Sequence, residues 1–156
     1  MQKIVPRYKA VIYFSLCLYL LLYSAPASAD KIKVVATIVP LADFARQVGG
    51  NKVEVTLLLP PGASPHTYEP TPKVVYEISR ARLFLKIGSG LEFWADKMLQ
   101  SAPADIMVVD SSSGVDLIKG NLHDHHNVHH RQDGQANIDP HIWLDPVLAQ
   151  DICRKI

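Results

Sequence analysis

Short β-branched runs alternate in this chain with segments whose apolar residues recur at helical spacing, and this alternation limits its possible folds more than any other feature. Four runs rich in Val, Ile and Leu are typical of buried strands, at residues 31–38, 53–59, 83–87 and 106–109. Three segments between them have helical spacing, at residues 40–48, 72–81 and 91–99. Strand–helix–strand units make right-handed crossovers, so the pattern predicts an α/β fold with a four-stranded parallel sheet and helices on both faces.

Two proline-containing turns are expected to begin helices. Thr71 followed by Pro72, and Asp145 followed by Pro146, each combine a favourable N-cap residue with a proline at the first helical position. The helix after Asp145 has three residues suited to an apolar face: Val147, Leu148 and Ile152. Apolar neighbours also place both tryptophans in the predicted core: Trp94 and Trp143.

The first 29 residues have the pattern of a secretory signal peptide that is removed before residue 30. A basic start precedes an uncharged apolar stretch at 10–23, which is shorter than the roughly 20 residues of a membrane span. Ala27 and Ala29 place small side chains where signal peptidase needs them. Leu16 before Cys17 is bulkier than a lipoprotein signal allows, so we expect a periplasmic protein without a lipid anchor.

Removal of this segment changes the sign of the net charge. Three of the 16 Lys and Arg residues lie within it and all 15 Asp and Glu residues follow it, so the charge goes from +1 to −2. Without a basic excess, nucleic acid and anionic membranes are excluded as main partners. We also expect a monomer. Cys153 then has no second cysteine, which leaves a free thiol, an intermolecular disulfide or a partner outside this sequence.

Outside one histidine-rich segment the chain has two histidines, and both fall in proline-framed turns. His66 follows the second predicted strand and His141 follows the fourth. Because ligands of parallel α/β sheets gather at the carboxyl ends of strands, we expect the two imidazoles at the same edge. Neutral imidazoles suit Zn²⁺ and other borderline divalent ions. Three nearby carboxylates are candidates to orient the rings: Glu69, Asp139 and Asp145.

Residues 119–137 have almost no apolar side chains and hold five of the seven histidines of the chain: His123, His125, His126, His129 and His130. Such a segment cannot bury enough apolar surface to offset its ordering entropy, so we expect a mobile loop. Its imidazoles predict weak, rapidly exchanging metal binding, as an auxiliary site. A role in capture and a role as solvated filler both remain open.

The sequence lacks the common catalytic motifs. It has no His-Glu-x-x-His pair, no Gly-x-Ser-x-Gly elbow, no Walker loop and no dinucleotide glycine fingerprint, so we expect no enzyme and no catalytic residue. Two alternatives from other classes remain. One is a secreted zinc hydrolase, for which Glu69 is the candidate general base. The other is a zinc buffer that acts through residues 119–137.

Four motifs resemble the zinc and manganese solute-binding proteins of ABC importers, the cluster A-I or TroA-like family: PGASPHTYEPTP at 61–72, DPHIWLDP at 139–146, GLEFW at 90–94 and VVAT at 34–37. The resemblance implies two α/β lobes joined by a long helix, with the ion between them. It also implies that His66 and His141 are the ligands given by the first lobe, and that an ABC permease in the inner membrane is the partner. The histidine-rich insert resembles the zinc branch, which favours Zn²⁺ over the alternative, Mn²⁺.

The resemblance divides the chain into three parts: a signal peptide at 1–29, an N-terminal metal-binding lobe at 30–145 with its histidine-rich loop, and the start of the connecting helix at 146–156. The sequence stops within that helix, so we expect a truncated chain without the second lobe and its ligands. Two histidines are too few for a closed tetrahedral zinc site. The expected function is a periplasmic, high-affinity binding protein that captures Zn²⁺ and delivers it to an ABC importer.

Overall fold

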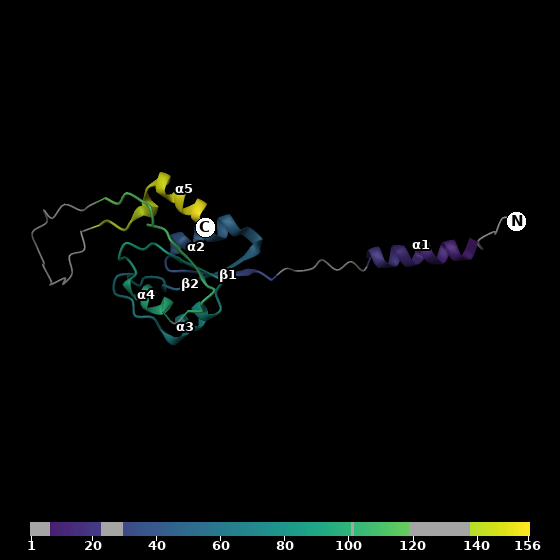
Figure 1. Ribbon diagram of the computed structural model, residues 1–156, viewed down its shortest axis with the longest axis horizontal. Coiled ribbons are helices and arrows are strands. Elements are labelled where there is room, and N and C mark those ends of the chain that lie inside the picture. Colours follow the sequence, from purple (N-terminus) through teal and green to yellow (C-terminus); the bar gives the residue numbers. More distant parts are fainter. Residues whose placement is uncertain (1–6, 23–29, 101, 119–137) are drawn as a thin grey trace, which may run out of the picture.

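The computed structural model describes residues 7–22, 30–100, 102–118 and 138–156 (Figure 1). The N-terminal helix α1 (Arg7–Leu22) covers most of the apolar stretch expected in a signal peptide. Among the described residues, no helix is both long enough and apolar enough to cross a membrane. The predicted cleavage site lies in residues 23–29, outside the described part of the chain, and stays a prediction.

Four parallel strands form one sheet in the order β2-β1-β3-β4. They are β1 (Ile32–Ala36), β2 (Val53–Leu57), β3 (Leu83–Lys86) and β4 (Met107–Asp110). Val34 in β1 pairs with Val55 on one side and with Leu83 on the other, so β1 lies inside the sheet. Since all strands run the same way, their carboxyl ends share one edge. The predicted α/β fold with a four-stranded parallel sheet is confirmed.

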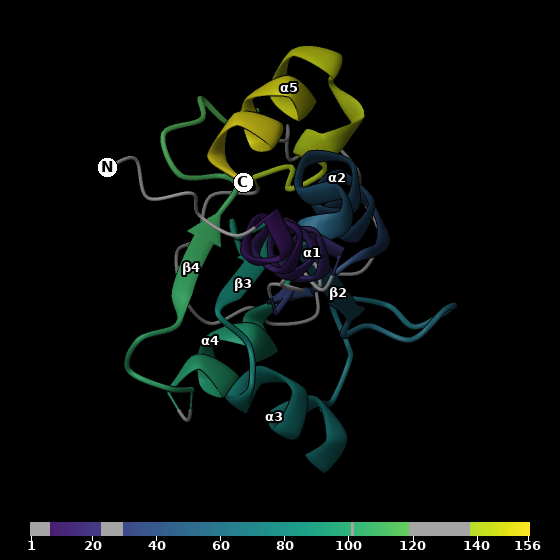
Figure 2. The same ribbon diagram turned by 90° about the vertical axis from the view of Figure 1, so that its right-hand side faces the viewer.

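Helices cover both faces of the sheet (Figure 2). The helices α2 (Val39–Gly49) and α5 (Pro146–Lys155) lie on one face, and α3 (Pro72–Ser79) and α4 (Phe93–Leu99) lie on the other. Two short 3₁₀ turns complete the described elements: η1 (Gly50–Lys52) after α2, and η2 (Ile142–Leu144) before α5. This two-sided cover is what crossover connections between parallel strands produce.

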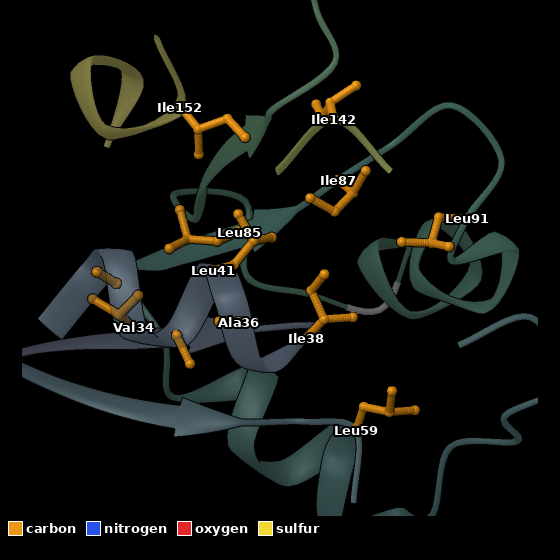
Figure 3. Packing of buried hydrophobic residues seen from close by; sticks show 12 residues of the cluster. Val34, Ala36, Ile38, Leu41, Leu59, Leu85, Ile87, Leu91, Ile142 and Ile152 are labelled. Carbon is orange, nitrogen blue, oxygen red and sulfur yellow. The ribbon is translucent and has the colours of Figure 1, made fainter. Parts of the chain in front are cut away.

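The sheet separates two hydrophobic clusters because neighbouring residues of a strand point to opposite faces. On the α2 and α5 face, Leu41, Leu85 and Ile152 are each fully buried, and Figure 3 shows their side chains within one cluster. On the α3 and α4 face, Phe84 is fully buried and Trp94 is 2% exposed. Each completely buried side chain of this size stabilises the fold by roughly 1.5–3 kcal/mol. The lobe is therefore held from both sides of one sheet.

The two predicted helix caps differ. Asp145 accepts hydrogen bonds at Oδ1 from the backbone N–H groups of Val147 (2.7 Å) and Leu148 (3.2 Å), so this cap is confirmed. Thr71 occupies the N-cap position of α3, but its side chain makes no capping hydrogen bond. The predicted positions of Thr71 and Pro72 are thus confirmed, but Pro72 rather than the threonine side chain supports the start of this helix.

Three further expectations need correction. The helix predicted over 91–99 begins at Phe93, because Gly88, Ser89 and Gly90 all have positive φ and form a turn instead. Val147 is 70% exposed and does not face the core, whereas Ile152 of the same helix is fully buried. Trp143 is only partly buried against the cluster on the α2 and α5 face.

Candidate metal centre

The candidate site is built from segments that follow the carboxyl ends of the strands. His66 lies in the connection between β2 and α3, and His141 lies between β4 and α5, directly before η2. Both imidazoles belong to exposed residues. The topology therefore places both predicted ligands in segments that follow strands of the same parallel sheet.

The segment that carries His66 is shaped by short-range hydrogen bonds. The backbone N–H of Ala63 donates to the carbonyl of Pro60 at 3.1 Å, across a turn in which Gly62 has a φ of 81°. The backbone N–H of His66 donates to Ser64 Oγ at 3.3 Å. The closely spaced prolines restrict the backbone further, since each fixes its own φ. These features place His66 as an exposed residue on an ordered turn.

His141 is held through both its backbone and its ring by one carboxylate oxygen. Asp139 Oδ1 lies 2.6 Å from His141 Nδ1 and 3.0 Å from the His141 backbone nitrogen. The ring also lies against Trp143, with centroids 5.1 Å apart. A carboxylate that accepts from Nδ1–H fixes the tautomer in which Nε2 has its lone pair free for a metal ion.

The contact with His141 also changes the titration of Asp139. The hydrogen bond from the His141 backbone N–H, followed by that from its ring, holds the pKa of the Asp139 carboxyl below its usual value. Both interactions favour the ionised carboxylate, which is the better acceptor for the imidazole N–H. The prediction that Asp139 orients a histidine is thus supported by geometry.

The other two predicted orienting carboxylates lie elsewhere. Asp145 uses its Oδ1 to cap α5, and Glu69 is exposed. In the described part of the chain, neither forms a hydrogen bond with a histidine. Asp145 therefore caps a helix and does not orient a histidine ring among the described residues, contrary to the expectation from the sequence.

The described residues do not form a complete metal site. No three His, Cys, Asp or Glu side chains within 7–22, 30–100, 102–118 and 138–156 gather closely enough to hold an ion. The structure brings together His141 and Asp139, while His66 lies on a separate turn. The five histidines of the predicted auxiliary loop lie in residues 119–137, outside the described part.

A buried carboxyl at the same edge was missed by sequence reasoning. Glu92 is 3% exposed and accepts hydrogen bonds from the Thr37 hydroxyl (2.6 Å) and from the backbone N–H groups of Ile87 (2.9 Å) and Gly88 (3.1 Å). Burial raises the pKa of this carboxyl, and these hydrogen bonds oppose the rise in part. Glu92 thereby joins the segments after β1 and β3 to the start of α4. The available signal was an acid between two apolar residues after a glycine-rich turn.

A basic side chain fixes the segment after β4. Lys155 in the last turn of α5 donates from Nζ to the carbonyl oxygens of Ser111 (3.0 Å) and Ser113 (2.8 Å). It also pairs with Asp151 at 2.9 Å. The two serine carbonyl groups, which lie beyond the end of β4, thereby gain a hydrogen-bond donor, and Lys155 attaches α5 to this edge of the sheet.

The fold and the site define a class: a parallel α/β lobe with a carboxylate-oriented imidazole beyond the carboxyl edge of its sheet. Residues 34–156 match the family model of the zinc-uptake complex component A, periplasmic (ZnuA), and the chain belongs to this family. The family resemblance of the histidine motifs is thereby confirmed. The ligand roles of His66 and His141 stay predictions.

Individual relatives agree with this assignment. The chain is 36% identical over 137 residues to the high-affinity zinc uptake system protein ZnuA of Bacillus subtilis, a match that covers 85% of this chain and 42% of that protein. A crystal structure of ZnuA matches with a TM-score of 0.68 and 31% identity, over 81% of this chain and 46% of the other. Zn(II)-bound AdcA from Streptococcus pneumoniae matches with a TM-score of 0.64 and 29% identity, over 80% and 24%. The matched part is thus less than half of each of these proteins.

Proposed function

We propose that this chain carries a metal-binding lobe that captures Zn²⁺ outside the cytoplasm for delivery to an ABC importer. His66 and His141 are the protein ligands that this lobe contributes. The proposal is supported by the family assignment and by the position of both histidines beyond the carboxyl ends of strands. Its role is transport, and no catalytic step is assigned to any residue.

The observation that carries the proposal is the pairing of His141 with Asp139. An Oδ1–Nδ1 distance of 2.6 Å directs the second ring nitrogen away from the carboxylate. Metal-bound histidines commonly donate their other ring N–H to a carboxylate in this way, which orients the ring and increases its basicity. An exposed imidazole with this support is prepared for an ion before the ion arrives.

The donor types favour Zn²⁺ over Mn²⁺ as the substrate. Imidazole nitrogen suits zinc, whereas manganese prefers carboxylate, carbonyl and water oxygens. The names of the relatives ZnuA from Bacillus subtilis and Zn(II)-bound AdcA also refer to zinc. Two histidines supply half of a tetrahedral site, so further donors complete it.

The surroundings of the protein follow from the same proposal. The family description is periplasmic, which supports export by way of a cleaved signal peptide at residues 1–29, and a mature chain without a lipid anchor is part of the same proposal. The proposed partner is the membrane permease of the importer, and the chain acts as a monomer. The hydrolase alternative gains no support, because its candidate base, Glu69, is exposed and forms no hydrogen bond to either histidine in the described part of the chain.

A zinc titration of the full chain tests the proposal. Affinity is measured by competition with a chromophoric chelator, in a background where the five histidines of residues 119–137 are replaced by asparagine. His66→Ala and His141→Ala should each weaken binding by more than about tenfold, since loss of an outer-shell partner alone costs about that much. The intact chain, compared with this background, reports the contribution of the loop.

Two results would decide against the site. If the double variant His66→Ala and His141→Ala binds zinc as tightly as its background, the ligand assignment is wrong. If the five asparagine replacements abolish all binding, the loop is the zinc-binding element and the protein acts as a buffer. Circular dichroism of each variant shows whether the fold is preserved.

A further inference from the structure

One side chain of α4, that of Trp94, contacts the chain on both sides of His66. Trp94 donates from Nε1 to the carbonyl oxygen of Pro65 at 3.1 Å. The Trp94 ring meets that of Tyr68 edge to face, with centroids 5.2 Å apart and an interplanar angle of 77°. Pro65 directly precedes His66 and Tyr68 follows it by two positions, so the histidine lies between two anchored residues.

Trp94 is itself fixed to the sheet. It is 2% exposed and packs in the cluster on the α3 and α4 face, together with Phe84. It lies in the first turn of α4, two residues after Glu92, whose carboxyl accepts hydrogen bonds from Thr37 and from backbone N–H groups of the turn after β3. The indole is therefore a rigid support to which the turn is attached.

His66 has less support of its own. Its side chain belongs to an exposed residue, and its backbone N–H donates to Ser64 Oγ at 3.3 Å. A ligand that must be ordered at the moment of binding weakens the complex, because the ordering costs free energy. Residues that fix the turn beforehand remove part of this cost.

We propose that Trp94 is a positioning residue for metal capture: through Pro65 and Tyr68 it holds His66 in the orientation that receives Zn²⁺. This inference rests on the proposed role of His66 as a zinc ligand. The indole N–H acts on the backbone of the turn and does not touch the ion. Loss of a direct outer-shell partner of a metal ligand typically costs about 10- to 100-fold in affinity, so loss of Trp94, which acts one residue further away, should lie at the lower end of that range.

A double-mutant cycle with zinc alone as the probe tests the inference. Trp94→Phe keeps an aromatic ring beside Tyr68 but removes the N–H donor. In the full chain with the five loop histidines replaced by asparagine, it should weaken zinc binding by about tenfold. In the same chain carrying His66→Ala it should change the residual affinity by less than about twofold, because no ligand is left for Trp94 to position.

Phe93→Leu is the matched control, because Phe93 is the neighbour of Trp94 on α4 and is 52% exposed. It should leave zinc affinity unchanged. Thermal unfolding of each variant is recorded alongside, since a purely structural role would lower the midpoint and reduce affinity equally with and without His66.

Tyr68 supplies a second pair of variants if Trp94→Phe fails to fold. Tyr68→Phe keeps the edge-to-face contact and should bind zinc as the background does, whereas Tyr68→Leu should weaken binding only when His66 is present. Equal losses with and without His66, or no loss in either, overturn the positioning role. If His66→Ala itself leaves affinity unchanged, the proposed ligand is wrong and the positioning role is overturned with it.

Discussion

The hydroxyl of Thr37 donates a 2.6 Å hydrogen bond to Oε1 of Glu92, across 55 positions of sequence. Thr37 is fully buried and directly follows β1, while Glu92 is 3% exposed and directly precedes α4. The bond joins the carboxyl end of an inner strand to the helix that supports the His66 turn. A buried polar contact of this kind stabilises the fold only while every partner is satisfied.

Removal of the Thr37 hydroxyl should destabilise the lobe. Thr37→Val preserves the shape of the side chain but deprives the buried Glu92 carboxyl of one donor, which should cost about 1–3 kcal/mol of the free energy of unfolding. Urea unfolding followed by circular dichroism measures the change. Thr67→Val, at an exposed threonine, should be nearly neutral. Equal stability of the two variants would contradict the importance of this bond.

The stability contributed by Glu92 should depend on pH in a defined direction. Burial raises the pKa of its carboxyl above the ordinary value of 4.5, so the folded state binds this proton more tightly than the unfolded state does. The resulting stabilisation is fully present below pH 4.5 and is lost as the pH rises through the raised pKa. The stability of the natural chain relative to Glu92→Gln should therefore fall as the pH rises above 4.5. Unfolding in urea at a series of pH values measures this difference, and a flat or rising difference would refute the expectation.

Asp139 should affect zinc affinity through His141. Asp139→Ala removes the acceptor of the ring N–H and should weaken binding by about ten- to hundredfold. Asp139→Asn keeps an acceptor oxygen without the charge, so the loss of zinc affinity should be smaller than in Asp139→Ala. Chelator competition measures both variants, with Asp116→Ala, at an exposed residue, as the control. An unchanged zinc affinity in Asp139→Ala would show that this carboxylate does not support a zinc ligand.

The two helix starts should respond differently to alanine. Asp145→Ala removes an acceptor for two backbone N–H groups of α5 and should cost about 1 kcal/mol. Thr71→Ala should change stability by less than about 0.5 kcal/mol, because the Thr71 side chain makes no capping hydrogen bond. Thermal unfolding of both variants compares them directly. A larger loss in Thr71→Ala than in Asp145→Ala would contradict the geometry of the caps.

Local patterns were sufficient to predict the sheet and its cover. All four strands and the helices α2 and α3 lie where hydrophobic spacing placed them, because burial against a sheet requires that spacing in the sequence itself, and α5 begins where Asp145 and Pro146 indicated. The boundaries were less accurate at α4. Gly88, Ser89 and Gly90 have positive φ values and form a turn, so the helix begins at Phe93, two residues later than apolar spacing indicates.

Long-range contacts account for what the sequence did not predict. The apolar neighbours of Glu92 were a local sign of its burial, but its side-chain partner, Thr37, lies 55 positions away, so the sequence did not show what would satisfy the carboxyl. Thr71 and Asp145 have the same type of local signal, yet only Asp145 forms the cap. The pairing of Asp139 with His141 was within reach of sequence reasoning because only two positions separate them.

The separation of the core into two clusters has a consequence for the pair of histidines. Pro65, next to His66, is bound by Trp94 from the cluster on the α3 and α4 face, whereas Ile142, next to His141, is buried in the cluster on the opposite face. The sheet therefore lies between the main supports of the two histidine segments, and Tyr68, two positions after His66, packs against both clusters. A cavity opened next to Ile142 should therefore disturb the His141 segment more than the contact between Trp94 and Pro65, so that a packing defect on one face changes the relative position of the two proposed ligands.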